Sequence, residues 1–379
     1  MAGLVVLAAP VLDMRLGLPD EGSMSTDTTQ RQAYDLTSEG FGEGFNAPLM
    51  VVVDAEGSDD SEAAAGTVME TLGGLDNVAT VTPPTFNEST DTAILTVIPE
   101  TGPGAPETEE LVHDIRDSRA GIVSSTGASV SVTGTTAINL DFSEKMSDAL
   151  VPYLGVVVGL SILLLMLAFR SILVPIKAAV GFLLTMGATF GLTVGIFQWG
   201  WFNGLLGIEQ TGPIISILPI VLIGVVFGLA MDYEVFLVSR MREAYAHGAQ
   251  PTQAVVTGFR HGARVVTAAA LIMISVFAGF VFTGEEFILQ VGLALAVAVA
   301  IDAFVVRMTI VPAVLSLLGN KAWWLPGWLD RIVPKVDIEG ESVGDAGRPG
   351  DVRRGGGSET DVSNDSSGMD DRETVTTGS

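Results

Sequence analysis

The chain has 379 residues with 44 acidic and 19 basic side chains, a formal net charge of −25, yet 48% of its residues are hydrophobic and its mean hydropathy is +0.48. That hydropathy excludes a single soluble domain, and the acidic excess argues against nucleic-acid binding because it would repel phosphate. With no cysteine, disulfides, thiolate catalysis and cysteine-based zinc sites are excluded as well. Charge is segregated along the chain: residues 13–148 hold 25 acids and 5 bases, residues 149–320 hold 7 of each, and residues 321–379 hold 12 and 7.

The chain begins with an apolar stretch, residues 1–12, that is too short to cross a bilayer, because a spanning helix needs about 20 apolar residues. The stretch lacks the basic start and the small-residue cleavage site of a signal peptide. We therefore expect residues 1–12 to be the outer end of a truncated transmembrane helix, in a chain that is a fragment or has a late-assigned start.

Residues 13–148 show the pattern of an α+β domain. β-Branched runs bounded by Pro, Gly and Asp predict strands at about 48–54, 77–82, 92–98 and 129–134. Helical periodicity predicts helices at about 58–73 and 105–123, a further helix at 29–40, and a helical lead into the membrane over 135–149. The order β-α-β-β-α-β is that of a ferredoxin-like unit. The only histidine of this domain, His113, has no catalytic partner in the pattern, so we interpret it as a surface residue.

Residues 149–320 form a membrane block in which five apolar runs are long enough to span. The runs cover about 150–168, 173–197, 213–238, 265–283 and 287–311. The loops at 169–177 and 239–264 carry Lys and Arg, as does the chain after the last span, whereas the loops at 198–212 and 284–286 carry none. The positive-inside rule then predicts that the basic loops and the C-terminus are cytoplasmic and that the acidic domain is outside.

The cytoplasmic tail, residues 321–379, changes composition part-way. From about residue 337 it is rich in Gly, Ser, Asp and Arg and almost free of apolar residues. Such a segment buries too little apolar surface to offset its chain entropy, so we expect disorder from about 337 onward.

The ionisable residue that most favours a function lies in the third span. Gly224, Gly228 and Asp232 are spaced four apart and fall on one helical stripe. Small residues let a neighbouring helix approach closely, so we expect Asp232 to face a helix–helix seam, with the hydroxyl of Tyr233 beside it. Protonation of such a carboxylate can be tied to the side of the membrane that it faces, and a proton crossing the membrane potential gains about 2.3 kcal/mol per 100 mV. The alternative is a neutral carboxyl that only hydrogen-bonds between helices.

The other charged residues of the spans are weaker candidates. Asp302 and Arg307 share the last span, but residues five apart do not share a face of an α-helix. We expect Arg307 and Lys177 to snorkel to the interface, which leaves a packing or topological role open. Glu234 lies near the inner boundary and points away from the glycine stripe. Asp302 and Glu234 are kept as secondary site residues, and no catalytic residue, metal site or cofactor is expected.

Four stretches together resemble one known family. GLAMDYEVFLVSRMREAY at 228–245 resembles the tenth transmembrane helix of MMPL (mycobacterial membrane protein large) transporters, of the resistance-nodulation-division superfamily. The stretches that agree in order and spacing are PVLDMRLGLPD at 10–20, GFRHGARVVTAAALIM at 258–273 and AIDAFVVRMTIVPAVLSLLGNKAWWLPGWLDRIVP at 300–334. The resemblance covers residues 4 to 337.

The resemblance implies an α-helical polytopic membrane protein with five full transmembrane helices, an N-terminal partial one and an external ferredoxin-like porter-type domain. Family members have two similar halves and export lipids or hydrophobic compounds with the proton gradient, using an Asp-Tyr pair in the fourth helix and another in the tenth. This chain resembles the second half, so its relay residues are Asp232 and Tyr233 and the other pair comes from a first-half chain or homologous subunit. A bacterial plasma membrane, membrane lipids and a lipid or hydrophobic substrate are implied as well.

Two other classes of function stay open beside this one. A non-transporting membrane scaffold, or a truncated remnant that binds a partner or lipid, would have the same spans. An intramembrane aspartyl protease would need a second carboxylate facing Asp232; Asp302 is the only other aspartate within a span, and GLAMD at 228–232 departs from a GxGD motif.

Overall fold

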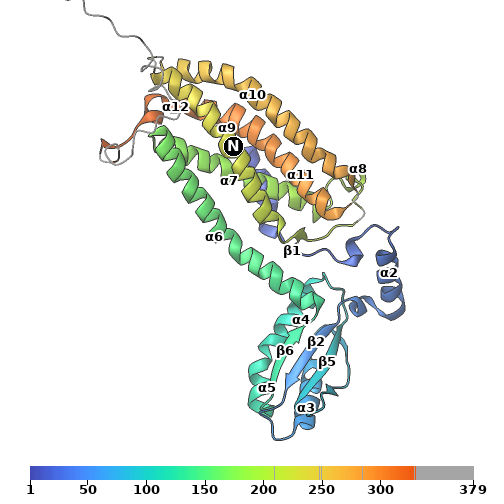
Figure 1. Cartoon of the computed structure of the whole chain (residues 1–379). Helices are drawn as coiled ribbons and strands as arrows, with labels where there is room; N and C mark the ends of the chain where they lie inside the picture. Colours follow the sequence, from blue (N-terminus) through green and yellow to red (C-terminus); the bar gives the residue numbers. More distant parts are fainter. Residues whose placement is uncertain (209, 247, 249, 284, 328, 330–379) are drawn as a thin grey trace, which may run out of the picture. The chain divides into compact units, whose positions relative to one another are not determined.

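The computed structural model describes residues 1–329 except 209, 247, 249, 284 and 328 (Figure 1). The predicted disorder from about residue 337 lies outside the described residues. Within them the chain forms an α+β domain and a set of long apolar helices.

The α+β domain is built on an antiparallel sheet in the order β3-β5-β2-β6, with the short strand β4 also paired to β5. The strands are β2 (Leu49–Asp54), β3 (Val78–Val81), β4 (Thr85–Phe86), β5 (Thr92–Pro99) and β6 (Ser129–Thr133), and the helices between them are α3 (Ser61–Gly73), α4 (Pro106–Asp117) and α5 (Arg119–Thr126). Each strand that follows a helical connection lies at an edge of the sheet: β3 follows α3, and β6 follows α4 and α5. This is the strand order of a ferredoxin-like unit.

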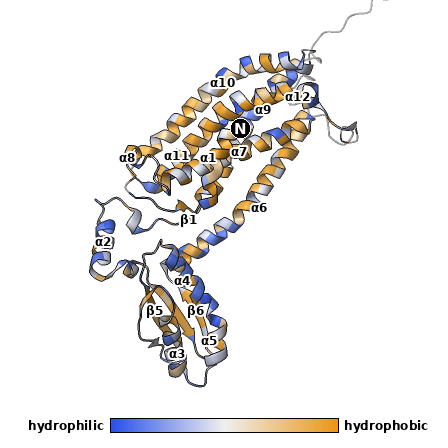
Figure 2. Ribbon diagram, turned by 180° about the vertical axis from the view of Figure 1, so that it is seen from behind, coloured by the Kyte–Doolittle hydropathy of each residue, from blue (hydrophilic) through white to orange (hydrophobic). Residues whose placement is uncertain are grey.

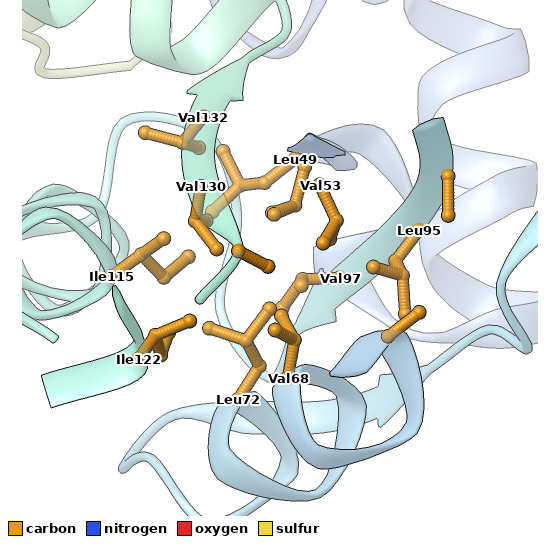
Figure 3. Close-up of a cluster of buried hydrophobic side chains, with 14 of the residues drawn as sticks. Leu49, Val53, Val68, Leu72, Leu95, Val97, Ile115, Ile122, Val130 and Val132 are labelled. Atoms are coloured by element: carbon orange, nitrogen blue, oxygen red, sulfur yellow. The ribbon is translucent and has the colours of Figure 1, made fainter. Parts of the chain in front are cut away.

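Strand alternation places the core of this domain on one face of the sheet. In β2 the side chains of Leu49, Val51 and Val53 are fully buried, whereas Met50 between them is 43% exposed. Helices α3, α4 and α5 cover the buried face with Val68, Leu72, Ile115 and Ile122, which point toward the strands (Figure 3). Burying each aliphatic side chain of this kind contributes about 1.5–3 kcal/mol, so the domain has a hydrophobic core of its own.

The predicted helix over 105–123 is two helices in the structure. Its break lies at Ser118, whose hydroxyl donates to the carbonyl of Ile115 at 2.8 Å. The junction between α4 and α5 is this single residue.

Five described helices are long and apolar enough to cross a membrane, the number that the hydropathy pattern predicts (Figure 2). They are α6 (Thr135–Phe169), α7 (Leu173–Phe197), α9 (Leu218–Ala246), α10 (Pro251–Gly279) extended by η4 (Phe280–Thr283), and a last span made of α11 (Glu286–Ala300), η5 (Ile301–Ile310), α12 (Val311–Leu318) and η6 (Gly319–Trp323). Each helix satisfies its own backbone hydrogen bonds, as a segment in hydrocarbon must.

Helix α7 lies at the centre of this set. In its most apolar 18-residue window 72% of the residues are buried, against 11% in the equivalent windows of α6 and α10. The apolar N-terminus, α1 (Ala2–Ala8) and η1 (Ala9–Asp13), packs on α7, where Gly191 leaves room for the Leu7 carbonyl. Among the five described spans, α7 and the last span (61% buried in its most apolar window) are thus mostly buried, whereas α6, α9 and α10 have large exposed faces.

Short segments join the ends of these helices to the α+β domain. Strand β1 (Leu16–Gly17) pairs in parallel with β7 (Ile214–Ile215), and the hydroxyls of Ser143 and Ser216 share a buried hydrogen bond of 2.7 Å. The remaining elements are η2 (Glu21–Ser23), α2 (Thr29–Phe41), η3 (Glu43–Asn46) and α8 (Asn203–Leu206). These contacts connect α6 and the first linker directly to the start of α9.

Candidate functional site

The predicted glycine stripe lies on an open face of α9. Asp232 and Gly228 are exposed, and a Cβ atom added to Gly228 would meet no described atom within 4 Å. Gly224, one turn earlier, is half-buried, and a Cβ there would lie 2.8 Å from the Tyr153 hydroxyl of α6. Among the residues that the structure describes, therefore, the expected seam is closed at Gly224 by α6 and is open at Gly228 and Asp232.

Tyr233 lies on a different side of α9 from the stripe. Its hydroxyl donates to the Met273 sulfur on α10 at 3.1 Å, and its ring packs beside Val266, Ala270 and Ala303. The adjacent pair Asp232 and Tyr233 thus points in two directions, the carboxylate outward and the ring inward between α9, α10 and the last span.

Glu234, which the sequence predicts only as a secondary site residue, is the centre of a buried charge network. Its side chain is 2% exposed, and its two oxygens bind two different cations. Lys177 on α7 reaches Oε1 at 2.5 Å, and Arg307 on η5 reaches Oε2 at 3.0 Å. Arg307 also donates from Nε to Asp302 Oδ2 at 2.5 Å. We call Lys177, Glu234, Asp302 and Arg307 the charge quartet; its formal charge is zero.

The pairing of Asp302 with Arg307 corrects the expectation that residues five apart cannot share a helical face. Residues Ile301–Ile310 are wound as a π-helix, in which the backbone bonds run from i to i+5; the N–H of Val311 accordingly donates to the carbonyl of Val306. Such winding brings residue i+5 above residue i. Asp302 and Arg307 therefore stand one above the other and form a direct ion pair.

Two further corrections concern the basic members of the quartet. Lys177 and Arg307 were expected to snorkel to the interface, but their side chains are only 10% and 4% exposed and both bind Glu234. A buried ion is costly unless it is paired and hydrogen-bonded, so each cation is held by the carboxylates that it meets inside the bundle. The sequence carried one signal for this: these four charges, two of each sign, lie within the spans and sum to zero.

One atom of the quartet has no hydrogen bond. Within the described residues, Asp302 Oδ1 is buried without a partner, whereas Oδ2 binds Arg307. Tyr233 lies near enough to interact electrostatically with both Asp302 and Arg307. Tyr233 is thus the member of the Asp232–Tyr233 pair that faces the quartet side of α9. No group of three or more acidic or histidine side chains in the described part of the chain is arranged to hold a metal ion.

Comparison with known proteins places the chain in a family. The MMPL family model matches residues 23–336. The chain belongs to the MMPL family. The membrane protein YdfJ of Bacillus subtilis is 49% identical over 341 residues, which cover 90% of this chain and 46% of that protein. The mycolic acid-containing lipids exporter MmpL11 of Mycolicibacterium smegmatis is 35% identical over 342 residues, 89% of this chain and 36% of that protein.

Membership in the MMPL family agrees with a multi-pass membrane protein whose relatives are transporters. The trehalose monomycolate exporter MmpL3 of Mycolicibacterium smegmatis is 36% identical over 235 residues, 62% of this chain and 23% of that protein. The chain spans less than half the length of the MMPL relatives that it matches. The residues of the stripe and of the quartet all lie within the matched range 23–336.

Proposed function

We propose that this chain is the C-terminal half of an MMPL exporter that moves lipids or hydrophobic compounds with the proton-motive force. In this proposal Asp232 and Tyr233 carry the proton, and a first-half chain or homologous subunit supplies the matching pair. The observation that supports it best is the open face at Gly228 and Asp232.

The physical argument rests on the cost of a carboxyl in a span. An ionisable group exposed to hydrocarbon is expensive, and such groups in membrane proteins face other helices or water. Asp232 has no ion pair or hydrogen bond to any described residue, although it lies in the middle of a 29-residue apolar helix. The four other charges of this region neutralise one another inside the bundle, so none of them is left to serve Asp232.

The missing cover is best supplied by another helix. Gly224 and Gly228 lie on the same stripe as Asp232 and have no side chain. Small residues at this spacing let a second helix come close enough for polar contacts. The relatives are at least twice as long as the matched segment, so their remaining length is a natural source of that helix. This supports an exporter that is assembled from two halves and argues against a scaffold that works alone.

The same proposal includes a direction in the membrane. The basic segments 169–177 and 239–264, which are largely helical ends, lie at the opposite ends of the spans from the α+β domain, and the Arg242 guanidinium lies 5.8 Å from the ring centre of Trp323 at that end. Positive loops are retained in the cytoplasm, so the domain 13–148 would lie outside and act as a porter-type domain. The plasma membrane of a bacterium provides the gradient that such an exporter needs.

The test is export by the chain expressed together with the first half of an MMPL relative, in vesicles with an imposed proton gradient. Asp232→Asn should abolish proton-dependent export while the chain still reaches the membrane and assembles, because the amide cannot accept and release a proton. Glu243→Gln is the matched control, since Glu243 is a carboxyl on the same helix that pairs with Arg240 at the surface. Export by Asp232→Asn at the parent rate would refute the relay. Assembly without export by the parent would favour a scaffold.

A further inference from the structure

The first turns of α6 belong to the α+β domain, and the same helix continues from there as the first apolar span. Ala137 is buried in the core of the domain, and Leu140 packs against that core. The helix is continuous from Thr135 to Phe169 (Figure 1). The contacts between the domain and α6 therefore determine how rigidly the domain is joined to a span.

Two ion pairs between α4 and α6 extend this attachment along α6. Arg116 Nη2 lies 2.7 Å from Asp141 Oδ1, and His113 Nε2 lies 3.2 Å from Glu144 Oε1. On each helix the two members are three residues apart, so they share a face. The pair of His113 and Glu144 lies one turn farther along α6, on the side of the span. The domain is thus fastened to α6 in two successive steps.

Of these two pairs, only the one with His113 responds to pH near neutrality. Arginine stays protonated in proteins, so Arg116 keeps its charge beside Asp141. Histidine is the side chain that changes charge between about pH 5 and pH 8, and only the imidazolium forms an ion pair with a carboxylate. The side chains of His113 and Glu144 are 49% and 46% exposed, so protons reach both from solvent.

The surroundings of His113 are mainly acidic. Glu109, one turn earlier on α4, interacts electrostatically with both His113 and Glu144. Burial raises the pKa of Glu109, whereas Arg15 and His113 act in the opposite direction. The other charged residues within four positions of either partner, or at the start of α5, are Glu110, Asp114, Arg116, Asp117, Arg119, Asp141, Lys145 and Asp148. A positive charge at position 113 therefore lies among mostly negative neighbours.

We propose that His113 and Glu144 form a pH-controlled clasp, which fastens a further turn of α6 to the α+β domain at acid pH and releases it at alkaline pH. The sign follows from the imidazole: protonation creates the ion pair, and deprotonation removes it. In the proposed orientation the clasp lies outside, so an acidic exterior stiffens the joint between the domain and the span. The clasp requires neither Asp232 nor export.

The test measures the separation of α6 from the domain by pulsed electron paramagnetic resonance on the full-length chain in detergent micelles. The chain has no cysteine, so Ser124→Cys on α5 and Ser147→Cys on α6, both exposed, place one spin label on each side. The distance distribution should be narrower at about pH 5.5 than at about pH 8. Since an exposed ion pair contributes little free energy, the population of the fastened state should change about twofold to fivefold.

Four variants of the labelled chain decide whether the clasp causes this change. His113→Gln and Glu144→Gln should each leave the distribution broad at both pH values, whereas His113→Arg should keep it narrow at both because arginine stays charged. Arg116→Gln is the matched control: it breaks the neighbouring pair between the same helices, so it should broaden the distribution at both pH values and preserve the difference. A parent without a pH difference would overturn the proposal, as would a difference that persists in His113→Gln and Glu144→Gln. The thermal midpoint shows that each variant is folded.

Discussion

Helix α9 carries two carboxyls, two residues apart, in opposite environments. Glu234 is 2% exposed and bound by two cations, whereas Asp232 is exposed and has no bond to any described residue. Glu234 is neutralised within this chain, because Lys177 and Arg307 bind its two oxygens and Asp302 balances the remaining positive charge. Asp232 would gain a polar partner only from a group outside the described residues. The difference separates a carboxylate that joins three spans through ion pairs from a carboxylate that is exposed on one helix.

The largest effect is expected from breaking the quartet. Arg307→Met removes the residue that joins Glu234 to Asp302, and loss of one partner of a buried ion pair costs about 3–5 kcal/mol because a charge is left unpaired. The free energy of unfolding can be measured by denaturant titration in detergent micelles, followed by tryptophan fluorescence. Arg240→Met is the control: Arg240 is half-exposed and pairs with Glu243 at the surface, a contact worth at most about 1 kcal/mol.

A double variant shows whether charge is the cause. Asp302→Asn combined with Arg307→Met removes one charge of each sign and restores the neutrality of the remaining pair, Lys177 and Glu234. It should therefore be more stable than Arg307→Met alone, since the two residues are in contact and their effects are not additive. A double variant that is less stable than the single one would mean that Arg307 acts through packing.

Much of the fold could be predicted from the sequence, because its signals are local. The five apolar runs predict the five long apolar helices, and the predicted strands at 48–54 and 129–134 coincide with β2 and β6 to within one residue. The predictions failed at short features. The predicted helix at 105–123 is interrupted at the single residue Ser118, and β4 has only two residues and no alternation to reveal it.

The site was predicted less completely than the fold. The stripe was visible because Gly224, Gly228 and Asp232 follow the period of an ordinary α-helix. The quartet was not, since its members come from three spans and since Asp302 meets Arg307 only in a π-helix. Nothing in the residue spacing distinguishes π from α winding. The role of Asp232 and Tyr233 as a relay stays a prediction.

The open stripe gives a smaller and opposite effect on stability. Gly228→Ala should stabilise the isolated chain by about 0.5–1 kcal/mol, because alanine favours helix and the added Cβ meets no described atom. Gly224→Ala should gain less, since its Cβ would lie 2.8 Å from the Tyr153 hydroxyl. Unfolding in micelles measures both. Gly228→Leu, whose Cβ likewise meets no described atom, should prevent assembly with a first-half chain. Assembly of that variant at the parent level would place the partner helix elsewhere.

The smallest expected effect concerns two carboxyls outside the spans, Asp20 and Asp91, whose pKa values shift in opposite directions. The difference should appear as a pH dependence of stability. Burial raises the pKa of Asp20, whereas hydrogen bonds from Asn87 and Thr92 lower that of Asp91. Ionised Asp20 therefore costs stability as pH rises through its raised pKa, and ionised Asp91 contributes stability that is lost as pH falls through its lowered pKa. At pH 7, compared with pH 3, Asp20→Asn should gain stability relative to the parent and Asp91→Asn should lose it, since asparagine can still cap η2 at position 20. Thermal midpoints at the two pH values measure this, and shifts of the same sign for both variants would show that burial at Asp20 and hydrogen bonding at Asp91 do not set the pH dependence of stability at these positions.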